Sequence, residues 1–80
     1  MERTDILSKV IDIVNDVLGV DPQDISEETT FDDIDADSLD RLQLVTAMED
    51  EFDVEIPDER LEAIGSVYDA VEAIEAALEA

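Results

Sequence analysis

The sequence predicts an all-α protein, a four-helix bundle with three longer helices, one short third helix and a long loop between the first two helices. Eighty residues leave no room for a second core, so we expect a single domain over residues 1–80. Hydrophobic residues make up 45% of the chain and recur at the i, i+3, i+4 spacing of amphipathic helices. Only two glycines and two prolines are present, so few positions interrupt these helices.

The first helix is predicted over residues 4–18. Thr4 is suited to the N-cap, and Asp5 is suited to the positive end of the helix dipole. Gly19 can take the left-handed conformation that ends a helix. Ile13 lies off the apolar stripe of this helix. The stripe itself consists of Ile6, Leu7, Val10, Ile11, Val14, Val17 and Leu18.

Residues 20–37 lose the helical periodicity and predict a long loop. The Asp-Pro pair at residues 21–22 predicts at most a short turn through Ile25. Nine acidic residues and no basic residue fall between Asp21 and Asp40. We expect Phe31 and Ile34 to anchor the loop on the core. A connection this long is unusual in so small a domain and favours a functional role.

The second helix is predicted over residues 38–52. Pro57 can open a short third helix that runs to about Ile64 and stops at Gly65. Ser66 with Asp69 three residues later resembles a capping box, which would open the fourth helix. The predicted inward stripe of the second helix is Leu42, Val45, Met48 and Phe52, flanked by Leu39, Leu44 and Ala47. The predicted buried face of the fourth helix is Val67, Val71, Ile74 and Leu78.

The charge of the chain is strongly negative. Twenty-five Asp and Glu against four Lys and Arg give a formal net charge of −21. This field repels nucleic acid and anionic lipid, attracts proteins with basic patches, and destabilises the fold through self-repulsion. Greater solubility, or adaptation to a salty cytoplasm, remains an alternative meaning of the same charge.

Several functional classes lose their usual residues. The chain has no Cys and no His, which excludes thiolate chemistry, disulfides and the commonest general base and metal ligand. No stretch approaches the length of a membrane span, and the first eight residues carry no apolar signal region. Together with the negative charge, these absences lead us to expect a cytoplasmic protein that binds neither nucleic acid nor membrane and is not an enzyme. We also expect a monomer.

The acidic residues 32–40 have a metal-binding interpretation. Asp33, Asp35 and Asp37 fit the start of a calcium-binding EF-hand loop, which requires Gly at its sixth position and Glu at its twelfth. Ser38 and Leu44 occupy these positions, so no dedicated metal site is predicted. Loose binding of divalent cations by an acidic interaction module remains open. Catalysis by paired carboxylates is not favoured, because nothing distinguishes any one pair.

Ser38 is a candidate modification site, because it stands where the loop meets the second helix and its hydroxyl should be exposed. A phosphodiester on this hydroxyl would face the free N–H groups and the positive dipole of the helix. From the residues alone, the alternative remains that Ser38, or the neighbouring Asp37, merely caps the helix.

The motifs around Ser38 resemble a known family. Residues 35–40 read D-A-D-S-L-D, which is similar to the G-A-D-S-L-D signature of bacterial-type acyl carrier proteins. Residues 44–52 resemble the L-V-x-A-x-E-x-E-F run of the same family, and residues 55–58 resemble its E-I-P-D segment. Residues 67–74 are similar to its final helix, so the resemblance covers essentially the whole chain.

The resemblance implies a carrier function. A phosphopantetheinyl transferase would move 4′-phosphopantetheine from coenzyme A onto Ser38, and acyl groups would then be carried as thioesters between fatty-acid-synthesis enzymes. Asp37 and Leu39 would be among the residues that the transferase recognises. Residues on the acidic second helix would dock on basic patches of partner enzymes; the candidates are Asp40, Arg41, Gln43, Glu49 and Asp50. The acyl chain would lie between the helices, with Leu42, Val45, Ile56, Leu61 and Ile64 as candidate lining residues.

Three residues depart from the family pattern. Asp35 replaces the usual Gly before the signature serine, Arg41 adds a positive charge to the second helix, and Gln43 stands where many members carry Glu. These departures bear on which partners are bound and how tightly. A dedicated carrier for a polyketide or another specialised acyl product is the alternative within the family.

Overall fold

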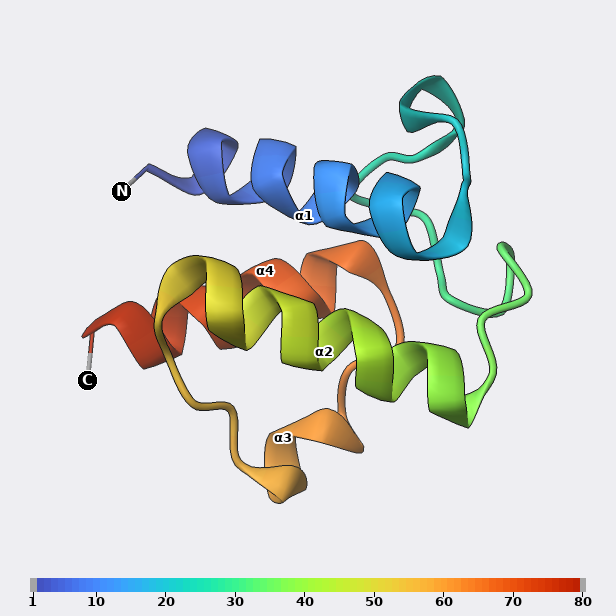
Figure 1. Ribbon diagram of the computed structural model, residues 1–80. Helices are drawn as coiled ribbons and strands as arrows, with labels where there is room; N and C mark the ends of the chain where they lie inside the picture. Colours follow the sequence, from blue (N-terminus) through green and yellow to red (C-terminus); the bar gives the residue numbers. More distant parts are fainter. Residues whose placement is uncertain (1, 80) are drawn as a thin grey trace.

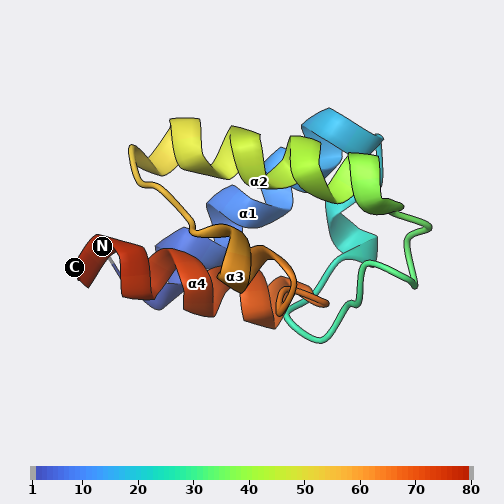
Figure 2. The same ribbon diagram turned by 90° about the horizontal axis from the view of Figure 1, so that it is seen from below.

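Three helices pack side by side in the computed structural model, which describes residues 2–79 and only the backbone of Asp58. They are α1 (Arg3–Leu18), α2 (Ser38–Phe52) and α4 (Val67–Glu79). The short α3 (Asp58–Leu61) lies on the side of α2 and α4 that faces away from α1 (Figures 1 and 2). Within residues 2–79 no strand forms, so the helical class and the long first loop are confirmed.

Helix α1 matches its predicted range but begins differently. Its N-cap is Glu2 rather than Thr4, and no side chain caps its first turn. Gly19 ends it in the left-handed conformation with a φ of 72°, as predicted. The placement of Ile13 off the apolar stripe was wrong, because Ile13 is buried together with Val14. Since α1 packs against both α2 and α4, a wider face is covered than one stripe requires.

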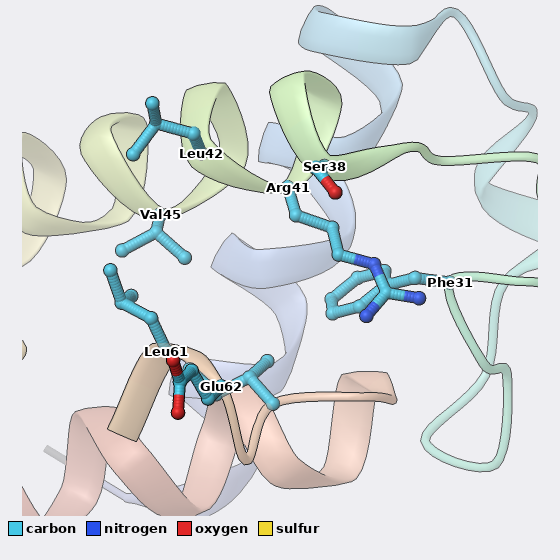
Figure 3. Close-up of a pocket in the computed structure, with 8 residues that line it drawn as sticks. Phe31, Ser38, Arg41, Leu42, Val45, Leu61 and Glu62 are labelled. Carbon is cyan, nitrogen blue, oxygen red and sulfur yellow. The ribbon is translucent and has the colours of Figure 1, made fainter. Parts of the chain in front are cut away.

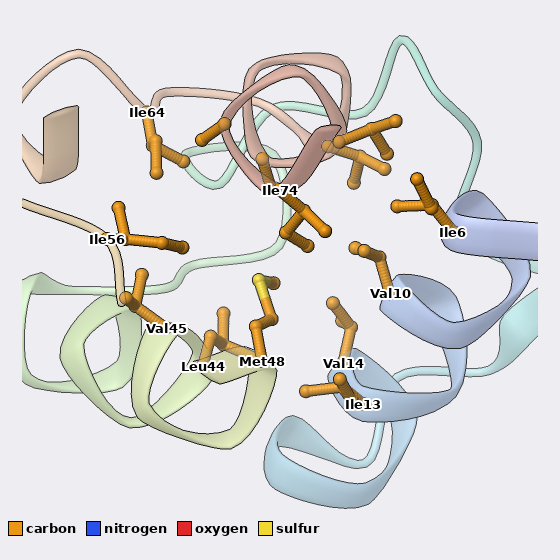
Figure 4. Packing of buried hydrophobic residues seen from close by; sticks show 14 of the residues in the cluster. Ile6, Val10, Ile13, Val14, Leu44, Val45, Met48, Ile56, Ile64 and Ile74 are labelled. Carbon is orange, nitrogen blue, oxygen red and sulfur yellow. The ribbon is translucent and has the colours of Figure 1, made fainter. Parts of the chain in front are cut away.

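The side chains of all three long helices and of the loop form one core (Figure 4). Phe31 is 1% exposed and is the largest fully buried side chain, which confirms its predicted role as a loop anchor. Ile34 is half-buried and packs against the same core. The short turn after Asp21 is also present, as the 3₁₀ helix η1 (Pro22–Asp24).

The loop is held to α4 by backbone hydrogen bonds. The Phe31 N–H donates to the carbonyl of Gly65 (3.1 Å). Two N–H groups of the first turn of α4 donate to loop carbonyls, Val67 to Thr29 (2.9 Å) and Tyr68 to Glu27 (3.0 Å). The first N–H groups of a helix lack partners within the helix, so the loop supplies them here.

Helix α3 is shorter than predicted. It ends at Leu61, and the next residues form tight turns in which the Ala63 and Ile64 N–H groups donate to carbonyls three residues back. Ile64 is buried in the core, and the Gly65 carbonyl is bonded to the loop. Both contacts draw the chain away from a helical path, so the predicted end at Ile64 was wrong.

The start of α4 contains half of the predicted capping box. The Asp69 N–H donates to the Ser66 hydroxyl (3.2 Å), as expected. The Asp69 carboxylate accepts from the Gly65 N–H (3.1 Å) and not from the Ser66 N–H, as a full capping box would require. At the other end, Leu78 is 40% exposed, which contradicts its predicted burial. It lies in the last turn, beyond the buried face that ends at Ile74.

Three of the four basic residues connect separate elements by ion pairs. Lys9 of α1 binds Glu51 of α2 at 2.8 Å, and this hydrogen bond raises the pKa of Lys9. Arg41 of α2 binds Asp32 in the loop at 3.1 Å. Arg3 of α1 binds one carboxylate in the loop and two in α4, namely Glu27, Glu72 and Glu75. The scarce positive charges therefore serve as cross-links between otherwise repelling segments.

Added monovalent salt should raise the melting temperature. With a net charge of −21, repulsion between carboxylates outweighs the few attractive pairs that salt also weakens. Thermal unfolding from low to physiological ionic strength measures this effect. Sucrose at the same osmolarity serves as an uncharged control, and a melting temperature that ignores salt would contradict the account of self-repulsion.

Asp53→Asn should stabilise the protein by about 0.5–1 kcal/mol. Asp53 is the C-cap of α2, with a φ of 54° in the left-handed region, and its carboxylate lies at the negative end of the helix dipole. Asn tolerates the same backbone conformation and removes the charge. Asp12→Asn, which loses the same charge from an exposed position in the middle of α1, is the matched control in urea unfolding. If both variants gain the same free energy of unfolding, the C-cap position of Asp53 makes no contribution of its own.

Candidate functional site

Ser38 is the first residue of α2, and its side chain is exposed. The helix is capped by its neighbours. The Asp40 N–H donates to the Asp37 carboxylate (2.9 Å), and the Asp37 N–H donates to the Asp40 carboxylate (3.4 Å), which completes a capping box. Within the described residues, the Ser38 hydroxyl makes no hydrogen bond. Of the two capping alternatives, the cap therefore belongs to Asp37, and the Ser38 hydroxyl remains available for chemistry.

A pocket of about 350 Å³ opens beside Ser38, between α2 and residues 61–64 at and after the end of α3 (Figure 3). Its size falls at the lower end of the range for small-molecule sites. Most of its lining is apolar, with polar groups at Ser38, Arg41 and Glu62. The apolar lining residues are Phe31, Leu42, Val45, Leu61 and Ile64. The arrangement can therefore shelter an apolar group that is tethered near Ser38.

Four of the predicted acyl-lining residues, namely Leu42, Val45, Leu61 and Ile64, border this pocket. Ile56 does not border it and is buried in the core instead. Leu42 was expected on the inward stripe of α2, but it is 53% exposed, because it lies on the side of α2 that faces the pocket rather than α1. Phe31, Arg41 and Glu62 were not expected in the lining, although Phe31 had been identified as a loop anchor.

The structure places the candidate docking residues in different situations. The carboxylate of Asp40 is part of the capping box, and the carboxylate of Glu49 accepts from the Ile56 N–H at 2.8 Å. Arg41 turns toward the loop, while Gln43 and Asp50 are exposed. Leu39 is also exposed (62%), directly beside Ser38. Asp40 and Glu49 therefore keep their charge, but their carboxylates are less free to reach a partner than the side chains of Gln43 and Asp50.

Asp35 is the position where the backbone near Ser38 is most constrained. It adopts a φ of 56°, in the left-handed region where glycine is most at ease and Asp is among the better-tolerated alternatives. Its N–H donates to the Asp32 carbonyl (3.2 Å), and the next N–H, that of Ala36, donates to the Phe31 carbonyl (2.9 Å). This tight turn directs the chain into the start of α2. The loss of glycine therefore leaves the turn in place.

Two negative findings concern the described part of the chain. Within residues 2–79, leaving aside the side chain of Asp58, no group of at least three carboxylates is arranged to hold a metal ion. No helix in the same range has both the length and the apolar composition required to cross a membrane.

Known proteins are similar to this chain over a range that includes Ser38 and all the residues that line the pocket. The model of a family described as "Phosphopantetheine attachment site" matches residues 8–74. The chain is 49% identical over 72 residues to an acyl carrier protein of Clostridium acetobutylicum, covering 89% of this chain and 94% of that protein. It is 47% identical over 77 residues to an acyl carrier protein of Prochlorococcus marinus, covering 95% of this chain and 96% of that protein.

Solved structures agree with these matches. The crystal structure of an acyl carrier protein from Thermotoga maritima superposes with a TM-score of 0.86 at 35% identity, covering 99% of this chain and 93% of that one. An acyl carrier protein from Enterococcus faecalis superposes with a TM-score of 0.78 at 33% identity, covering 96% and 99% of the two chains.

Proposed function

Because this chain belongs to the family of acyl carrier proteins, we propose that Ser38 is the residue to which its 4′-phosphopantetheine arm is attached. The family carries acyl groups and is not a family of enzymes; fatty-acid synthesis is its typical role. The observation that carries the proposal is the exposed hydroxyl of Ser38, which the cap of α2 does not use. Ser66 differs in this respect, because its hydroxyl accepts the N–H of Asp69.

The residues around Ser38 fit the arm. The serine hydroxyl is open to a transferase, and the mostly apolar pocket beside it suits the first part of an acyl chain. Once attached, the arm supplies a terminal thiol on which acyl groups are held as thioesters, a group that this chain without Cys lacks. Asp37 keeps the helix start in place through its cap, while the exposed Leu39 offers an apolar contact to the transferase.

The pocket supports a role in shielding the acyl chain. Val45 and Ile64 belong to the core, whereas Leu42 and Leu61 are more exposed and lie toward solvent. An acyl chain that enters between Leu42 and Leu61 would cover these side chains and gain the free energy of apolar burial. We assign the lining role to Leu42, Val45, Leu61 and Ile64. Ile56 would be reached only by a chain that penetrates further into the core.

The partners of the protein are a phosphopantetheinyl transferase and acyl-handling enzymes. We propose that they dock on the outer face of α2 through basic patches, with Gln43 and Asp50 in contact and Asp40, Arg41 and Glu49 acting mainly within this chain. Encounters steered by charge are fast and sensitive to salt. We further propose that the protein acts as a cytoplasmic monomer.

Incubation with coenzyme A and a phosphopantetheinyl transferase tests the function. Intact mass should rise by one phosphopantetheinyl group, and peptide mapping should locate that group on Ser38 rather than on Ser8, Ser26 or Ser66. Complete absence of the adduct, or an adduct on another serine, would contradict the proposal. The acyl groups recovered from cells then distinguish fatty-acid synthesis from the less favoured specialised pathways.

A further inference from the structure

Arg41 is the basic side chain in the pocket lining (Figure 3). It follows Ser38 by three residues, a spacing that places two side chains next to one another on a helix. Its Nη2 atom donates to the Asp32 carboxylate at 3.1 Å, and its Nε atom donates to the Ala36 carbonyl at 3.4 Å. The guanidinium carbon lies 5.5 Å from the centre of the Phe31 ring.

A phosphodiester on Ser38 meets an unfavourable field. It carries a negative charge, and five carboxylates lie within six residues of Ser38 in the sequence, those of Asp32, Asp33, Asp35, Asp37 and Asp40. The dipole of α2 offsets part of this repulsion. Arg41 offers more, because a planar guanidinium can donate two hydrogen bonds to one phosphate group.

The present partners of Arg41 can be exchanged at small cost. The side chain of Asp32 is 92% exposed, and an ion pair with an exposed carboxylate contributes little to stability. The bond to the Ala36 carbonyl is long at 3.4 Å. Stacking on Phe31 keeps the guanidinium at the pocket whether it binds Asp32 or a phosphate group.

We propose that Arg41 is a positioning residue that binds the phosphodiester oxygens of the arm on Ser38 and releases Asp32 in return. This inference rests on the proposed function, since it requires an arm at Ser38. The contact holds the first atoms of the arm at the pocket, next to Leu42 and Phe31. The arm therefore starts from a fixed direction instead of moving freely in solvent.

Phosphorus NMR of the loaded protein tests the proposal. We compare wild type, Arg41→Gln and Asp32→Asn, after intact mass has shown that each chain carries the arm. Arg41→Gln should shift the phosphorus resonance toward that of the free arm in solution and narrow it. Asp32→Asn breaks the same ion pair but leaves Arg41 free for the phosphate, so its resonance should remain as in wild type. If the phosphorus resonance changes equally in both variants, Arg41 acts only by holding the loop through Asp32, and the proposal is overturned.

Thermal stability gives a second, independent measurement. Loading should lower the melting temperature of Arg41→Gln by roughly 2–4 °C more than that of wild type, because the added charge then lacks its partner. Arg41→Lys keeps the charge without the paired donors and should fall between the two. If loading shifts all three proteins equally, Arg41 does not contact the arm. If the wild type itself takes up no arm, the assignment of Ser38 as the attachment site is contradicted instead.

Discussion

Ser38→Ala should take up no phosphopantetheinyl group under conditions that load the wild type completely. The hydroxyl oxygen is the atom that would form the bond to phosphorus, and alanine has no substitute for it. The stability of Ser38→Ala should stay within about 0.5 kcal/mol of wild type, because an exposed side chain outside the cap is removed. Intact mass and urea unfolding on the same sample measure both effects.

Ser66→Ala is the matched control with the opposite pattern. It should load normally, because Ser66 lies just before α4 and is not among the residues that line the pocket. It should lose about 1 kcal/mol of stability, since its hydroxyl accepts the N–H of Asp69. If Ser38→Ala still loads, or if only unfolded Ser38→Ala fails to load, the attachment site is not established at Ser38.

Phe31→Ala should cause a large loss of stability, about 3–5 kcal/mol. The ring is 1% exposed and belongs to the core, although Phe31 lies in a turn of the loop and in no helix. Its removal leaves a void beneath the pocket and takes away the surface on which Arg41 stacks. A domain of this size has modest stability, so a loss of this order would unfold a substantial part of the population.

Two further variants make the expected loss specific. Phe31→Leu keeps much of the apolar volume and should be clearly less harmful than Phe31→Ala. Leu78→Ala removes a large apolar side chain that is 40% exposed, so its effect should stay near 0.5 kcal/mol. Chemical denaturation at a fixed salt concentration gives all three values. Similar losses for Phe31→Ala and Leu78→Ala would show that the loop contributes little to the core.

The end of α1 and the range of α2 could be predicted because local signals agree with one another there. The apolar spacing of α1 stops at Gly19, and α2 starts after Asp37, a good N-cap residue. The side of a helix that is buried is a different matter, because it depends on the neighbours. Ile13 is buried because α1 contacts two helices, and Leu42 is exposed because the pocket lies where a core was assumed. No local pattern carries this information.

In the candidate site, too, local features could be predicted, whereas contacts between separate parts of the chain could not. The exposure of Ser38 follows from its place at a helix start and was predicted. The bonds of Glu49 to the Ile56 N–H and of Arg41 to Asp32 join residues seven and nine positions apart. Such contacts depend on how the chain turns after each helix, so the sequence alone predicts both side chains to be free docking groups.

The loop carbonyls that accept from Val67 and Tyr68 also determine how the chain opens locally. In most proteins the end of a helix frays by itself, and its first amide protons exchange quickly with solvent. Here those protons are released only when residues 27–31 detach from α4. The loop and the start of α4 therefore form one cooperative unit, although some 35 residues separate them, and protection against hydrogen exchange should be shared across it.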